Sequence, residues 1–174
     1  MADIQNTPPD TTLPPHVSLE DFKAGMARLA GAVNIVTTDG PGGRSGFTAS
    51  AVCSVTAEPP TLLVCLNRSS SVAPVFARNT SICVNTIGPR HKDLAMLFGG
   101  KSSTEDRFAA AEWTPGLTGA PVLSQAVVSF DCTVTDRASV GSHDVLFCEI
   151  HAVTGDPSGP GLAYFARKFH ELVS

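Results

Sequence analysis

The sequence has few charged residues and no cluster of basic ones. Only 16% of its 174 residues are Asp, Glu, Lys or Arg, and the formal net charge is −4. Nucleic acids are bound mainly through Lys and Arg side chains on phosphates, so we expect no nucleic-acid partner. With 43% hydrophobic residues, a chain the size of one domain can form a substantial core. The low charge also indicates that part of the surface is buried against a partner.

Long hydrophobic runs are also missing. No stretch approaches the roughly 18 apolar residues of a membrane-spanning helix, so we expect no membrane association. The first residues, MADIQNTPPDTTLPP, are acidic and polar, unlike a secretory signal. We therefore expect a cytoplasmic protein with a flexible N-terminal arm over residues 1–17 and one folded domain over residues 18–174.

Several motifs that would define a site are absent or incomplete. The five cysteines are odd in number and include no C-x-x-C pair, so we interpret them as small core residues of a reducing cytosol. The histidines show no ligand spacing, and we expect no metal. Gly99-Gly100-Lys101-Ser102 contains the GKS of a phosphate-binding P-loop, but Ala95 stands where the first glycine belongs. No G-x-G-x-x-G is present, which excludes a Rossmann fingerprint.

Hydrophobic periodicity predicts many short strands and few helices. Ser18, with Asp21 three residues on, is a candidate helix N-cap. The expected helices cover residues 19–30, 71–78 and 90–98. The expected strands cover residues 33–37, 46–56, 61–66, 82–86, 128–135, 145–153 and 161–166, with a mixed loop over 99–126. This order favours a closed or nearly closed antiparallel barrel decorated by helices.

The run GFTASAVCSVT over residues 46–56 is the most informative of these strands. Its odd positions are apolar and its even positions are mostly hydroxyls, which predicts one buried face and one face of small polar side chains. That second face either contacts water or lets a flat ligand lie close to the backbone. The following loop, residues 67–71, adds an amide, hydroxyls and the cation of Arg68, a set that suits a phosphate.

His143 lies in a tight glycine turn, VGSHD, that opens a strongly apolar strand. A loop at a strand end is a place where a rigid scaffold presents a functional side chain. The other interpretation is a turn histidine that only bonds its neighbours, and spacing alone does not decide between the two.

Taken together, the segments resemble the short-chain flavin reductase family, the reductase partners of two-component flavin-dependent monooxygenases. The resemblance covers nearly all of residues 19–170. It rests on FKAGMARLAGAVNIVTT, GFTASAVCSVTAEPPTLLVCLNRSSSVAPVF, CVNT, LFGGKSSTEDRFAAAEW and GSHDVLFCEI. It implies a mainly β fold with peripheral helices, a split β-barrel that binds FMN, in a homodimer with flavin near the subunit interface.

The activity implied by the resemblance is NAD(P)H-dependent reduction of FMN, with FAD also possible, and release of reduced flavin to a flavin-dependent monooxygenase. NADH or NADPH would be the co-substrate. Carried over by position, the flavin contacts would be Arg44, Ser45, Gly46, Phe47, Thr48, Ser50, Ala51, Cys65, Leu66, Asn67, Ser71, Val72, Leu97 and Phe98. His143 matches the histidine of the family's Gly-Asp-His turn, associated with the nicotinamide, although Ser142 replaces the acidic residue.

Hydride transfer from a nicotinamide to a flavin needs no protein acid or base, so we assign no proton-transferring residue. Two other interpretations remain. One is a non-catalytic flavin carrier or redox sensor built on the same barrel. The other is a split-barrel oxidase of the pyridoxamine-phosphate kind, whose phosphate site would ordinarily carry more Arg and Lys than this chain offers.

Overall fold

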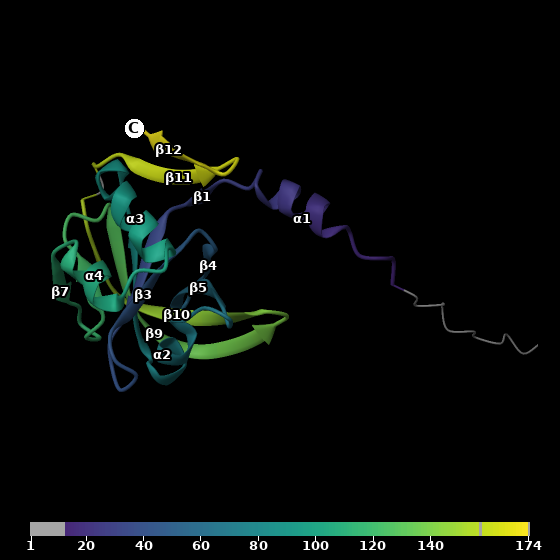
Figure 1. Cartoon of the computed structure of the whole chain (residues 1–174). Coiled ribbons are helices and arrows are strands. Elements are labelled where there is room, and N and C mark those ends of the chain that lie inside the picture. Colours follow the sequence, from purple (N-terminus) through teal and green to yellow (C-terminus); the bar gives the residue numbers. More distant parts are fainter. Residues whose placement is uncertain (1–12, 157, 174) are drawn as a thin grey trace, which may run out of the picture.

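The computed structural model describes residues 13–156 and 158–173 (Figure 1). Its helices are α1 (Leu19–Met26), α2 (Ala73–Arg78), α3 (Lys92–Gly99) and α4 (Thr104–Ala109), with the 3-10 turn η1 (Pro89–His91) before α3. Its strands are β1 (Gly31–Ala32), β2 (Asn34–Thr38), β3 (Ser45–Ala49), β4 (Val52–Ala57), β5 (Pro60–Asn67), β6 (Ser81–Thr86), β7 (Trp113–Pro115), β8 (Pro121–Leu123), β9 (Val128–Val140), β10 (His143–Thr154), β11 (Gly161–Phe165) and β12 (Lys168–Leu172).

The described residues form one sheet of seven antiparallel strands in the order β3-β2-β6-β9-β10-β5-β4. Strands β3 and β4 are consecutive in the chain yet lie at opposite edges of the sheet, which is possible because the sheet curls round on itself. The enclosed side chains form one apolar core that draws on β2, β3, β5, β6, β9 and β10 and is closed by Val72 and Phe76. The sequence prediction of a mainly β barrel with peripheral helices is confirmed.

A second apolar core lies outside the barrel wall. Strand β2 is buried along its whole length: Val36 faces the barrel interior, whereas Ile35, like Val33 just before the strand, contacts the outer core. Helices α3 and α4 and strands β7 and β8 lie together at this side of the barrel (Figure 1). Phe98 and Phe108 bring α3 and α4 into this core, with their rings 5.4 Å apart. The outer core therefore fixes the end of α3 against β3.

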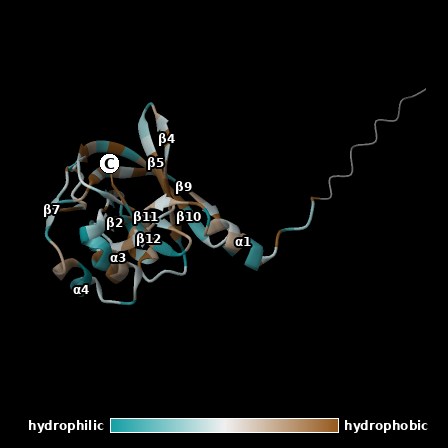
Figure 2. Cartoon of the chain, turned by 90° about the horizontal axis from the view of Figure 1, so that it is seen from above, coloured by the Kyte–Doolittle hydropathy of each residue, from teal (hydrophilic) through white to brown (hydrophobic). Residues whose placement is uncertain are grey.

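Helix α1 begins where the sequence predicts and ends earlier. Ser18 caps it, since its Oγ accepts a hydrogen bond from the Asp21 backbone N–H at 3.0 Å. The helix ends at Met26 instead of residue 30. None of its residues is buried, and Figures 1 and 2 show it lying apart from the barrel. Of the expected arm over residues 1–17, residues 1–12 lie outside the described residues and residues 13–17 form no helix or strand.

The expected strand over residues 46–56 is wrong as one element. It divides into β3 and β4, with a break at Ser50 and Ala51. The alternation holds for Phe47 and Ala49 only, because Ala51 at the break and Cys53 and Val55 in β4 are exposed. The alternating pattern cannot show that the two halves belong to different edges of the sheet.

Three further expectations need correction. Residues 61–66 do not form a strand covered on both faces, because burial alternates along β5. The mixed loop over residues 99–126 contains α4, β7 and β8, and β12 follows β11 without having been predicted. The cysteines are all free, but only Cys83, Cys132 and Cys148 are buried, so the core interpretation fails for Cys53.

No helix in the described ranges combines the length and the apolar character needed to cross a bilayer.

Candidate functional site

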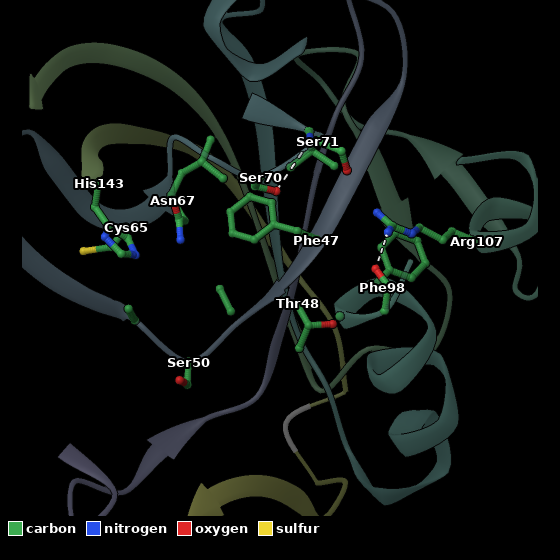
Figure 3. A pocket seen from close by; sticks show the side chains of 16 residues that line it. Phe47, Thr48, Ser50, Cys65, Asn67, Ser70, Ser71, Phe98, Arg107 and His143 are labelled. Carbon is green, nitrogen blue, oxygen red and sulfur yellow. Dashed lines mark hydrogen bonds between the residues drawn. The ribbon is translucent and has the colours of Figure 1, made fainter. Parts of the chain in front are cut away.

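A half-open cavity of about 330 Å³ lies where β3, β5, α3 and the start of β10 meet (Figure 3). Its walls are formed by Phe47, Thr48, Ala49, Ser50, Ala51, Cys65, Leu66, Asn67, Ser70, Ser71, Val72, Phe98, Gly99, Gly100, Arg107 and His143. The volume falls in the range of small-molecule sites, about 300–1,000 Å³. A second cavity of about 380 Å³ shares Thr48, Ala49, Ser50, Gly99 and Gly100 with it.

The break between β3 and β4 forms one wall of the cavity. At the break, the Val52 backbone N–H donates to the Ser50 carbonyl at 3.0 Å, and the Cys65 N–H of β5 donates to the Ala51 carbonyl at 3.0 Å. These bonds hold a short non-strand segment of small side chains at the edge of the barrel. The Thr48 hydroxyl donates its hydrogen to the Ala95 carbonyl of α3 at 2.5 Å, so it does not donate to a ligand in the cavity.

The hydroxyl-rich loop between β5 and α2 is held by Asn67. The Asn67 Oδ1 accepts hydrogen bonds from the backbone N–H of Ser69 at 2.9 Å and from its hydroxyl at 2.8 Å. This Asx-type turn presents Ser70 and Ser71 to the cavity while leaving the Asn67 amide nitrogen as a donor. The loop therefore supplies neutral hydrogen-bond donors along one wall.

Arg68 lies in that loop but does not line the cavity. Its guanidinium donates to the Gly141 carbonyl and its Nε lies 4.0 Å from Asp144 Oδ1. The sequence-based interpretation of Arg68 as a phosphate cation is therefore not supported by its placement, because the side chain ties the loop to the turn between β9 and β10.

Arg107 of α4 does line the cavity, although sequence reasoning did not select it. It is only 4% exposed. Its Nη1 donates to the Gly46 carbonyl at 2.9 Å and its Nη2 to the Gly100 carbonyl at 2.8 Å. Its Nε is buried and makes no hydrogen bond to the described residues. In a single sequence, one arginine in a short amphipathic segment gives no signal that distinguishes it from a surface cation.

His143 lines the cavity at the end opposite Arg107 (Figure 3). It is the first residue of β10 and pairs with Asn67 of β5 in the ladder. The turn before it needs the positive φ of Gly141, +55°, which a glycine adopts without strain. The Ser142 hydroxyl lies 2.9 Å from His143 Nδ1, which leaves the Nε2 side of the exposed ring for a ligand.

Cys65 lies close to His143 in the cavity (Figure 3). Burial, and to a lesser degree the neighbouring Cys53, raises the pKa of the Cys65 thiol above its ordinary value. The thiol is therefore neutral near pH 7, which makes it a small apolar wall residue and a poor nucleophile.

The cavity brings together most of the flavin contacts implied by the resemblance. Those that line it are Phe47, Thr48, Ser50, Ala51, Cys65, Leu66, Asn67, Ser71, Val72, Phe98 and His143. The others lie elsewhere: Ser45 and Gly46 are buried in β3, Arg44 is exposed and pairs with Asp39 at 2.9 Å, and Leu97 faces a separate cavity. The residues missed were Ala49, Ser70, Gly99, Gly100 and Arg107.

These features suit a flavin. The small side chains at the strand break leave room for a flat ring, and the serine loop offers donors to a tail. Arg107 adds a buried cation whose Nε has no partner within the part of the chain that the structure describes. The fold and the cavity thus define a small β-barrel protein with a cavity that suits a planar ligand with an anionic tail. The chain belongs to the flavin reductase like domain family, whose model matches residues 26–173.

Curated relatives are similar over most of their length. An FMN reductase (NADH) RutF from Pantoea ananatis is 55% identical over 175 residues, covering 98% of this chain and 92% of the relative. One of the same name from Yersinia enterocolitica is 59% identical over 157 residues, covering 90% of this chain and 86% of the relative. A crystal structure of a proposed flavin reductase from Haemophilus somnus is 44% identical with a TM-score of 0.87, covering 90% of this chain and all of that one.

Three segments predict the same relationship within the family. DGPGGRSGFTASAVCSVT, LFGGK and SVGSHDVLFC resemble the FMN reductase of the bacterial pyrimidine-utilisation (Rut) pathway, and the names of the curated relatives confirm this likeness. The next nearest likeness predicted from the sequence, to the reductase component of 4-hydroxyphenylacetate 3-monooxygenase, stays a prediction.

Proposed function

We propose that this protein is an NADH-dependent FMN reductase that supplies reduced flavin to a partner flavin-dependent monooxygenase. The observation that carries the proposal is the cavity at the strand break, where the contacts implied by the family meet a histidine at one end and a buried guanidinium at the other. The family match and the FMN reductase (NADH) relatives support the same assignment.

Different residues of the cavity contact the ring and the tail of the flavin in this proposal. Ser50 and Ala51 leave space at the barrel edge for the flavin ring, while Phe47 and Val72 supply apolar contacts beside it. Ser70, Ser71 and the amide of Asn67 donate hydrogen bonds to the polar tail and ring edge. Thr48 contributes indirectly, because its hydrogen bond to the Ala95 carbonyl holds the cavity wall against α3.

Catalysis here depends on holding two planar groups together. The flavin, when bound, supplies the atom that accepts a hydride from the reduced nicotinamide. Because that transfer needs no side-chain acid or base, the chain contributes by positioning the reactants and excluding water. His143, fixed by Ser142 and by its ladder partner Asn67, orients the nicotinamide through a hydrogen bond. The adjoining cavity, with apolar Met96, Tyr164 and Phe169, offers room for a second ring.

We further propose a homodimer with the flavin near the subunit interface. Several large apolar side chains are exposed in the single chain: Leu19, Phe22, Met26 and Leu29 near α1, and Val55 of β4. Phe22, Met26 and Leu29 also line one shared hollow, and exposed apolar side chains gathered in this way are typical of an interface. Its position beside Ser50, which also lines the cavity under α1, supports a dimer that completes the site. The free thiols support a reducing, cytoplasmic setting.

The test is NADH oxidation, followed as the decay of its absorbance with a catalytic amount of protein and excess FMN. We expect multiple turnovers, faster with NADH than with NADPH and faster with FMN than with FAD or riboflavin. A non-catalytic carrier or sensor would bind FMN and turn over at most once per bound flavin. Coupled product formation by an added flavin-dependent monooxygenase tests the supply of reduced flavin, and light scattering of the eluting protein tests the dimer.

A further inference from the structure

We propose that Arg107 is the buried cation that pairs with the 5′-phosphate of the flavin and thereby makes the site prefer FMN to riboflavin. The inference rests on the proposed function, because it assigns a phosphate-binding role within the same cavity. It goes beyond the flavin contacts implied by the family resemblance, among which Arg44 is the charged residue, and Arg44 lies outside this cavity.

The guanidinium of Arg107 is held in place by backbone alone. The carbonyls of Gly46 in β3 and Gly100 after α3 each accept one of its hydrogen bonds, at 2.9 and 2.8 Å. The Phe98 ring centre lies 6.0 Å from its central carbon and adds a weak cation–π contact. These contacts fix the plane of the group, yet the buried Nε has no partner among the described residues. Nη1 and Nη2 each keep a second N–H that these bonds do not use, so the guanidinium is oriented before any ligand arrives.

No carboxylate of the described residues forms an ion pair with Arg107. The ion pairs within residues 13–156 and 158–173 are Arg44–Asp39 and Arg68–Asp144, and neither involves Arg107. Burying an unpaired charge is costly, and carbonyl dipoles replace only part of its lost hydration. An anion in the adjoining cavity would complete the compensation. A phosphate is the best match, because a planar guanidinium can donate two parallel hydrogen bonds to its oxygens.

The position of Arg107 along the cavity agrees with a phosphate at that end. Figure 3 shows Arg107 at one end, with Ser71 on its side of the cavity, and shows His143 and Cys65 at the other end. The hydroxyls of Ser70 and Ser71 supply neutral donors to the same tail. A flavin whose ring lies toward His143 therefore places its ribityl phosphate toward Arg107.

The test compares FMN with riboflavin, which has the same ring and no phosphate. Dissociation constants of both flavins are measured by quenching of flavin fluorescence with the wild-type protein, Arg107→Met and Arg107→Lys. Arg137→Met is the matched control, because Arg137 also bonds two backbone carbonyls, those of Phe76 and Asn79, but does not line the cavity. Circular dichroism and thermal unfolding verify that each variant is folded.

We expect wild type to bind FMN more tightly than riboflavin. In Arg107→Met the dissociation constant of FMN should rise by about tenfold to a hundredfold, the usual effect of losing a charge-assisted hydrogen bond, while that of riboflavin changes little. Arg107→Lys should keep part of the preference, and Arg137→Met should keep all of it. If Arg107→Met does not fold, Arg107→Lys decides the question, since a lysine cannot reproduce the bidentate geometry and must reduce the preference.

Two results would overturn the proposal: an unchanged preference for FMN in the folded Arg107 variants, or equal losses of affinity for FMN and riboflavin. The second result would mean that Arg107 only braces the cavity wall. Both leave the proposed function standing, provided that wild type binds FMN and oxidises NADH. If wild type binds neither flavin, the proposed function itself fails.

Discussion

Replacing Gly46 by alanine should destabilise the fold and also weaken flavin binding, because the added methyl group displaces residues that form the cavity wall. Gly46 lies buried in β3, where an added Cβ would stand 2.7 Å from Cε1 of Phe98 and 3.0 Å from the carbonyl oxygen of Val36. Real side-chain carbons do not approach that closely. The obstacle is steric rather than conformational, because Gly46 has no positive φ. Either the Phe98 ring moves or β3 separates from β2.

The cost can be judged from what surrounds Phe98. The side chain is 1% exposed, and its ring centre lies 5.4 Å from that of Phe108 and 5.6 Å from that of Trp113. Because interiors are closely packed, the ring cannot turn away without disturbing both neighbours. Overpacking of this kind costs about 1–3 kcal/mol. For a domain of this size, a loss of about 2 kcal/mol lowers Tm by about 4–8 °C.

The measurement is thermal and urea-induced unfolding of the flavin-free protein, with Gly25→Ala as the control. Gly25 lies in α1 with nothing within 4 Å of its added Cβ, so the same substitution there relieves a helix-interior glycine and should leave stability unchanged or increase it by about 0.5–1 kcal/mol. The Gly46 variant should also bind FMN more weakly, because Phe98 lines the cavity and the Gly46 carbonyl holds Arg107.

The reasoning would be refuted if Gly46→Ala unfolded at the wild-type temperature and wild-type urea concentration. That result would mean that the Phe98 ring does not rest on β3, and the placement of the end of α3 beside the cavity would then be incorrect. A normal stability combined with weak FMN binding would separate the two roles of Gly46 and assign the loss to Arg107 alone.

Three further changes test the site. His143→Ala should raise the KM for NADH by about tenfold, as expected for one lost hydrogen bond, and raise that for FMN much less; equal increases in steady-state assays would remove the nicotinamide role. Ser50→Leu should weaken FMN binding at least about tenfold, because a bulky side chain enters the space at the strand break, and unchanged affinity in a fluorescence titration would place the ring elsewhere. Cys65→Ser should retain at least about half of the turnover at pH 7, because the raised pKa keeps the wild-type thiol neutral there; loss of NADH oxidation in the folded variant would point to thiol chemistry instead.

The sequence predicts the barrel better than it predicts the ends of its strands. Alternation identifies β9 and the part of the run over residues 46–56 that forms β3, because each has a face in the barrel core. It fails over residues 52–57, where β4 lies at the sheet edge and the apolar Cys53 and Val55 are exposed. Hydrophobic residues in a strand usually indicate burial in the assembled protein, but β4 is mostly exposed in the single chain. This difference is what the proposed homodimer would account for.

The sequence predicted those site residues that belong to one local segment. It did not predict those whose role depends on tertiary packing. The serine loop and the residues around the strand break follow from their own composition, and so they were selected. Arg107 was missed because its role depends on carbonyls of Gly46 and Gly100, which lie in other segments. Arg68 was selected because it lies in the loop, yet a contact with the distant turn at Gly141 draws it away from the cavity. Side-chain direction is set by partners that one sequence does not reveal.

The break at Ser50 and Ala51 explains why the cavity lies where it does. A sheet that closes into a barrel must bring its two edges together, and here the chain passes directly from one edge strand to the other at this point. Continuous pairing would fill the gap with backbone and side chains. Because the crossing residues are small and are held by only two backbone hydrogen bonds, the wall stays open on the outside while the core behind it remains closed. A planar ligand can therefore contact the backbone without entering the core, so binding and release need no unfolding of the barrel, as the proposed transfer of reduced flavin to another enzyme requires.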